Sequence, residues 1–198
     1  VMSARINIGQ RYILLLYPLL VLLAVDRLWE RILRWPKLGA WCAAALIAAQ
    51  AASCLSVAPH YLAYFNRAAG GPERGWHLLV DSSIDWGQDL PGLAREIERR
   101  DRRRVALVYF GTAVPRAYGV EADNVPALKL PLDEYDTLAI SVTPLQGLYV
   151  LGDDPFREFR SLRPIGRAGY SILIFDLAEP PGLDAFRAAL SRYRRCQD

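Results

Sequence analysis

The sequence predicts two membrane-spanning α-helices followed by a soluble α/β domain. Two uncharged apolar runs lie before Pro59, and a basic connector separates them. After that point the chain alternates short strand-like runs, rich in β-branched and aromatic residues, with amphipathic helical stretches. We therefore divide the chain into residues 1–59, which hold the two helices, and residues 60–198, which form the α/β domain.

The second apolar run, Leu38–Ala58, carries no charge. At 1.5 Å per residue it spans about 30 Å, which matches the hydrocarbon thickness of a bilayer. It is rich in alanine and also contains Gln50, Ser53 and Ser56. Small and polar residues of this kind are typical of a helix that packs against other membrane helices.

The first apolar run, Ile13–Val25, is shorter, and its length alone also fits a buried core helix or the core of a signal peptide. The residues that follow it, Asp26–Trp29, contain no small-residue cleavage site, which argues against a signal peptide. Pro18 is tolerable in a membrane helix that has helical neighbours. We interpret this run as a second spanning helix, with a soluble core helix as the alternative.

The orientation of the two helices in the membrane follows from the charge of the connector between them. Basic residues outnumber acidic ones there: the basic residues are Arg27, Arg31, Arg34 and Lys37, and the acidic ones are Asp26 and Glu30. Short basic loops stay on the cytoplasmic side. Two crossings then place both flanks on the outer face, periplasmic or extracellular, of a bacterial cell (inner) membrane. The lipid bilayer is the first expected partner.

Within the outer domain the hydrophobic periodicity predicts each element in turn. These are a helix at Leu90–Arg100, strands at Val105–Phe110 and Thr137–Val142, a hairpin arm at Arg163–Gly169, a strand at Ser171–Leu177 and a helix at Asp184–Arg195. Asp89 is placed to N-cap the first helix, and Pro91 fits its first turn. A net charge of +3 is too small to indicate a nucleic-acid partner, and no metal-ligand spacing is present.

The densest group of candidate site residues lies between Asp81 and Asp89, where three carboxylates are spaced four residues apart. On one continuous helix they would share a face, as a metal site or an acid/base pair requires, but Gly87 and the adjacent serines oppose a helix. One interpretation is caps and Asx-turns, with Trp86 in the core or at the membrane surface. The other gives at least one of Asp85, Gln88 and Asp89 a ligand-facing role.

Three further features are candidates. His60 and Tyr64 belong to an aromatic segment that follows the second apolar run, and such a segment is typical of an anchor in the membrane interface. The alternative is that His60 acts as a general base. Arg5 and Arg11 precede the first run on the outer side, where a guanidinium can bind a lipid phosphate or pair with ordinary headgroups. Residues 111–112 and 141–143 follow predicted strands, where open α/β sheets tend to bind ligands.

Several of these segments, in order along most of the chain, resemble bacterial family-39-type glycosyltransferases, relatives of the protein O-mannosyltransferases. The resemblance is carried by Asn7–Leu14, Pro59–Asn66, Gly70–Glu73, Asp81–Asp89, Tyr109–Thr112, Tyr118–Gly119 and Ser141–Tyr149. The Asp-Trp-Gly-Gln-Asp run is its most specific part.

The resemblance implies a multi-helix (GT-C) membrane enzyme that moves a sugar from a polyprenyl-phosphate donor to an acceptor on the outer face. The family's catalytic acid lies in an upstream loop with no counterpart here, so no catalytic residue is assigned. We expect further N-terminal transmembrane helices, an inactive isolated chain, and no cofactor besides the lipid-linked donor as substrate. Arg5 and Arg11 become candidates for binding the lipid phosphate. The candidates for acceptor binding or docking are His60, Tyr64, Asp85, Trp86, Gln88 and Asp89. The alternative is a non-catalytic anchored domain that binds a protein or envelope partner.

Overall fold

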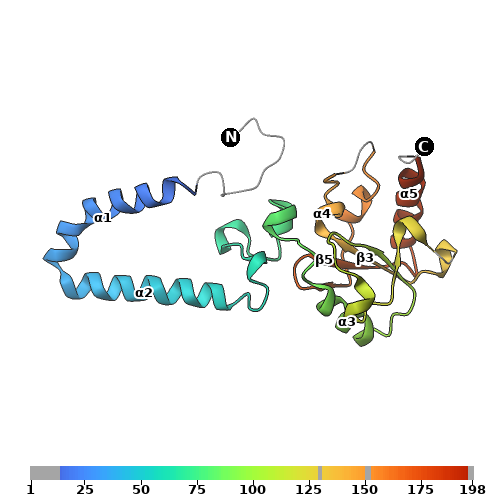
Figure 1. Cartoon of the computed structure of the whole chain (residues 1–198), viewed down its shortest axis with the longest axis horizontal. Helices are drawn as coiled ribbons and strands as arrows, with labels where there is room; N and C mark the ends of the chain where they lie inside the picture. Colours follow the sequence, from blue (N-terminus) through green and yellow to red (C-terminus); the bar gives the residue numbers. More distant parts are fainter. Residues whose placement is uncertain (1–13, 129–130, 150–152, 196–198) are drawn as a thin grey trace.

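A computed structural model describes residues 14–128, 131–149 and 153–195 of the chain. It contains a pair of long helices, α1 (Leu16–Arg34) and α2 (Pro36–Leu55), and an α/β domain that lies to one side of them (Figure 1). The segment between α2 and the first helix of the domain, coloured cyan to green, lies between the helical pair and the sheet.

Helix α2 coincides with the second apolar run, and no residue of it is buried within the chain. Among the residues described, it is the one helix that is long and apolar enough to cross a membrane, with a mean hydropathy of 1.6. The prediction of a spanning segment there is therefore supported by length and composition. A second spanning helix is not shown.

The connector between the two helices differs from its prediction. Helix α1 continues through the charged residues to Arg34, so that Trp35 alone separates it from α2. The charged stretch contains Leu, Arg and Glu, which are good helix formers, and no glycine or proline interrupts it before Pro36. Pro36 then occupies the first turn of α2, where its missing N–H is not needed.

The domain is built on a mixed five-stranded sheet of order β2-β1-β3-β5-β4. Its strands are β1 (Val105–Val108), β2 (Asp123–Asn124), β3 (Thr137–Ser141), β4 (Gly166–Ala168) and β5 (Ile172–Asp176). Strand β1 runs parallel to β2 and β3, whereas β5 runs antiparallel to β3 and β4. The three predicted strands and the hairpin arm are confirmed. Strand β2 was not predicted, because two residues give no periodicity.

One face of the sheet is covered by α3 (Leu90–Arg99), whose Leu90 and Leu93 pack with Leu107, Ala139 and Ile174. These strand residues alternate with neighbours that point to the other face, as the pleat requires. The predicted helix is therefore confirmed, and its apolar stripe is what holds it on the sheet.

The opposite face is covered by α5 (Gly182–Arg195), whose Phe186 packs with Leu138, Ile140 and Phe175. Figure 1 shows α3 and α5 on opposite sides of the sheet. The remaining short helices are α4 (Val142–Leu145) and the 3₁₀ turns η2 (Tyr61–Ala63), η3 (Arg67–Ala69), η4 (Gly75–His77), η5 (Asp81–Ser83), η6 (Pro115–Tyr118), η7 (Val125–Ala127), η8 (Leu132–Glu134) and η9 (Arg157–Arg160).

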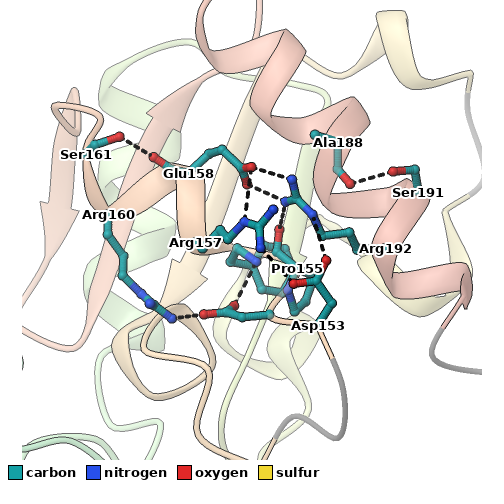
Figure 2. Close-up of polar contacts among 11 residues, drawn as sticks. Asp153, Pro155, Arg157, Glu158, Arg160, Ser161, Ala188, Ser191 and Arg192 are labelled. Carbon is teal, nitrogen blue, oxygen red and sulfur yellow. Dashed lines mark hydrogen bonds and ion pairs between the residues drawn. The ribbon is translucent and has the colours of Figure 1, made fainter.

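Helix α5 is also held by an ion-pair network (Figure 2). The guanidinium of Arg192, only 9% exposed, contacts the Glu158 carboxylate at the start of η9, reaches Asp153 at 3.3 Å, and donates to the carbonyl oxygen of Pro155 at 3.4 Å. A buried guanidinium needs such partners, since an unpaired buried charge is costly. The network fixes the 153–158 segment against the end of α5.

Candidate functional site

The candidate site lies at the edge of the sheet where the parallel strands β1 and β3 end. Strand β5 begins at the same edge, because Ser141 pairs with Ile172. Side-chain and backbone bonds tie the three strand ends together: the Phe110 amide donates to Ser141 Oγ at 3.1 Å, and the Val142 amide donates to the Ser171 carbonyl at 2.8 Å. The 81–89 segment lies across this edge.

Asp85 is fully buried in this segment. Its Oδ1 accepts the Gly87 amide at 3.1 Å, which is an Asx-turn, and its Oδ2 accepts the Thr143 amide at 3.5 Å. The Thr143 hydroxyl accepts the Asp81 amide at 3.0 Å and is also hydrogen-bonded to Asp85. Burial raises the pKa of the Asp85 carboxyl to about 6, although the bonds from Gly87 and Thr143 oppose the increase.

Asp89 is 3% exposed, and one of its oxygens, Oδ2, gathers most of its donors. It accepts the Ser171 hydroxyl at 2.8 Å, the Ser171 amide at 3.1 Å and the Tyr170 amide at 3.2 Å. Asp89 does occupy the N-cap position of α3, but its side chain makes no cap hydrogen bond. The predicted side-chain cap is therefore wrong: the carboxylate is turned toward the start of β5 instead.

The other oxygen of Asp89 binds His60. The distance from His60 Nδ1 to Asp89 Oδ1 is 2.8 Å, and the His60 ring stands edge-on to Tyr170 with centroids 5.7 Å apart. Since His60 lies five residues after the last residue of α2, this bond joins the end of the apolar helix to the α/β domain.

The other predicted site residues have distinct positions. The Tyr64 hydroxyl is 3.0 Å from Ser53 Oγ near the end of α2, so this tyrosine packs back on the apolar helix. Trp86 is 60% exposed, so the core position considered for it is excluded. Gln88 accepts the Trp86 amide at 2.8 Å and donates to the Ile84 carbonyl at 3.0 Å, and so braces the turn. Arg5 and Arg11 lie outside the described residues.

The structure thus brings together His60, Asp85, Gln88 and Asp89 and turns Trp86 outward. It also adds Ser171, Tyr170 and Tyr109, which the sequence analysis missed. Tyr170 and Ser171 carry no motif signal, because only the antiparallel return of β5 brings them to this edge. Tyr109, whose hydroxyl donates to the Gly87 carbonyl at 2.8 Å, lies within a segment that the resemblance includes.

A cavity of about 940 Å³ opens beside this edge, at the end of β1. Its walls include Val108, Phe110, Pro144, Tyr149, Phe156 and Tyr193. Among the described residues, no charged side chain lines it. Within the same described ranges, no three His, Cys, Asp or Glu residues are grouped so as to hold a metal ion.

Comparison with protein-family models, with curated proteins and with solved structures finds no match to this chain. The site therefore has to be interpreted from its own geometry. Both buried carboxylates accept several hydrogen bonds from the protein itself, so the arrangement is suited to holding segments together and to orienting His60.

The raised pKa of Asp85 predicts a pH-dependent contribution to stability. The folded state binds the Asp85 proton more tightly than the unfolded state, so this contribution is present at low pH and is lost as the pH rises from about 4 through about 6. The loss amounts to roughly 3 kcal/mol, from about 1.4 kcal/mol for each pKa unit. In urea unfolding of the full chain in detergent, we expect Asp85→Asn to remove this part of the pH dependence. Equal pH profiles for the variant and the wild type would contradict the assignment.

A second prediction compares two glycines with left-handed backbones. Gly169 has a φ of +53°, and a Cβ there would lie 2.2 Å from Asp89 Oδ2. Gly71 has a φ of +74°, and a Cβ there would meet nothing within 4 Å. Alanine at Gly71 should cost about 1 kcal/mol of unfolding free energy from backbone strain alone. Gly169→Ala should cost roughly 2 kcal/mol more, because the buried carboxylate must move. Equal losses, measured by urea unfolding, would show that Asp89 is loosely held.

Proposed function

We propose that this chain is the C-terminal part of an integral-membrane glycosyltransferase. The enzyme transfers a sugar from a polyprenyl-phosphate donor to an acceptor on the outer face of a bacterial cell membrane. In this proposal α1 and α2 both cross the bilayer, and further transmembrane helices upstream supply the catalytic acid. The α/β domain lies on the periplasmic or extracellular side.

The observation that carries the proposal is the hydrogen bond between His60 and Asp89. Both residues belong to segments on which the family resemblance depends, and they are 29 positions apart in the chain. Their bond connects the end of the apolar helix α2 to the strand-end edge of the sheet. These two resembling segments therefore lie together, and in this proposal they form the membrane-proximal end of the domain, where a lipid-linked donor would be presented.

The same geometry supports a docking role for Asp85 and Asp89 over a role as general base. A general base needs a free lone pair within reach of the acceptor hydroxyl. Asp89 has its oxygens occupied by Ser171, Tyr170 and His60, and Asp85 is fully buried. We assign the pair to positioning, and we keep Arg5 and Arg11 as candidates for stabilising the departing lipid phosphate.

A second candidate function is a non-catalytic outer domain that is anchored by α2 and binds an envelope partner. The internally satisfied carboxylates also favour this reading, because they leave no activated nucleophile at the edge. The two candidates differ in one respect: only the transferase requires additional membrane helices and a lipid-linked donor.

The transferase proposal is tested with the full-length protein in native membranes supplied with radiolabelled undecaprenyl-phosphate hexose. We expect the label to move to an acceptor, and we expect Asp89→Asn to lower this transfer by about tenfold or more, because the domain is no longer docked. The matched control is Glu98→Gln, a change on the exposed side of α3, which should leave the transfer within about twofold of the wild type. Protein levels in the membrane are measured alongside.

Two results would contradict the proposal. One is a wild-type protein that is correctly inserted yet transfers no label from the donor, which would favour the partner-binding domain. The other is unchanged transfer in Asp89→Asn, which would remove the docking role while leaving the enzyme class intact.

A further inference from the structure

The cavity at the end of β1 is a feature of the domain that the docking site does not use. It lies between the end of β1, η7, α4 and the end of α5, and its volume of about 940 Å³ is at the upper end of the range for small-molecule sites. Charged side chains are absent from the described part of its lining, so it is unsuited to a phosphate or a carboxylate ligand. A neutral ligand of more than one ring fits this space.

Aromatic rings form much of the wall. Tyr109, Phe110, Tyr149 and Tyr193 all line the cavity. The rings of Phe110 and Tyr149 are parallel within 5°, with centroids 6.1 Å apart, and Tyr149 is 63% exposed. Parallel aromatic rings in a cavity wall offer an aromatic platform to the face of a ligand ring.

The rim of the platform is polar. The Tyr149 side chain interacts with the carboxylate of Asp81, and the Asn124 side chain belongs to the lining. Both Asp81 and Tyr149 have left-handed backbones, with φ of 56° and 66°. Such conformations are costly for residues other than glycine, and they persist where surrounding contacts fix them. The carboxylate and the ring are thus held beside each other at the entrance.

The far wall is fixed as well. Arg192 of α5 bonds to the Pro155 carbonyl and to Glu158 (Figure 2). It thereby ties the chain on either side of Phe156 to the helix that carries Tyr193. These ion pairs and the bond to the Pro155 carbonyl hold this wall of the cavity in place without a ligand.

We infer that this cavity binds a neutral carbohydrate of two or more rings, the acceptor glycan of the proposed transferase. A pyranose has a face of C–H groups that packs on aromatic rings and a rim of hydroxyls that need polar partners. The lining provides the Phe110 and Tyr149 rings for the face and Asn124 for the hydroxyls, and Asp81, which lies outside the lining, is next to Tyr149. A pure hydrocarbon, such as an isoprenoid chain, would use the apolar wall but would leave these polar groups without ligand partners.

The inference is tested on the full chain in nanodiscs by saturation-transfer NMR. The probes are three neutral disaccharides (maltose, cellobiose and lactose), with farnesol as the hydrocarbon alternative. We expect saturation transfer to at least one disaccharide. We expect Tyr149→Gly to weaken its binding by about tenfold or more, because the ring is lost while the left-handed backbone becomes relaxed. Since glycine suits this φ, the variant keeps the fold.

Tyr61→Ala is the matched control, because Tyr61 is an exposed tyrosine, 55% accessible, that does not line the cavity. Its disaccharide affinity should equal that of the wild type. The inference is overturned if no disaccharide binds, if Tyr149→Gly binds as tightly as the wild type, or if farnesol alone occupies the site.

This inference rests on the proposed function but fails separately from it, since binding is measured without any transfer reaction. If a disaccharide binds and the full-length protein transfers no sugar, the domain is a carbohydrate-binding module and the transferase proposal alone is withdrawn.

Discussion

The buried carboxylate of Asp89 is the constraint on which the contact between the end of α2 and the sheet depends. A polar group removed from water is costly unless hydrogen bonds within the protein replace those to the solvent. Asp89 obtains these from the end of α2 through His60, and from the start of β5 through Tyr170 and Ser171. Three segments that are far apart in the sequence must therefore adopt compatible conformations before the carboxylate is satisfied.

Asp85, four residues earlier in the chain, also accepts a hydrogen bond from a distant segment, and it connects the 81–89 segment to the end of a different strand. Its bonds to Thr143 fix the start of α4, and the Thr143 hydroxyl in turn holds the Asp81 amide. The two carboxylates together fasten one loop to both β3 and β5. Asp81 in turn interacts with Tyr149, which lines the aromatic cavity, so the 81–89 segment contacts a residue of the cavity wall.

The framework of the domain was predictable from the sequence, because each central element buries one face and so carries a periodic pattern. Strands β1, β3 and β5 and helices α3 and α5 were all found in this way. The continuation of α1 through the basic stretch was not predicted. The charges there indicated a loop, whereas the helix propensity of the same residues favoured a helix. The Asx-turn at Asp85 followed from its local sequence. The partners of Asp89 could not be found from the local sequence, because Tyr170 and Ser171 reach it only through the antiparallel return of β5. The Asp89 carboxylate binds these donors and makes no cap hydrogen bond to α3.

The most direct test of this account is a double-mutant cycle between His60 and Asp89. The free energy of unfolding of the α/β domain is measured in the detergent-solubilised full chain for His60→Ala, Asp89→Asn and the double variant. If the carboxylate joins the end of α2 to the sheet as described, the two losses are non-additive by about 1 kcal/mol or more. Losses that add to within about 0.3 kcal/mol would show that the two residues stabilise the protein independently, and the proposed docking would then have no basis.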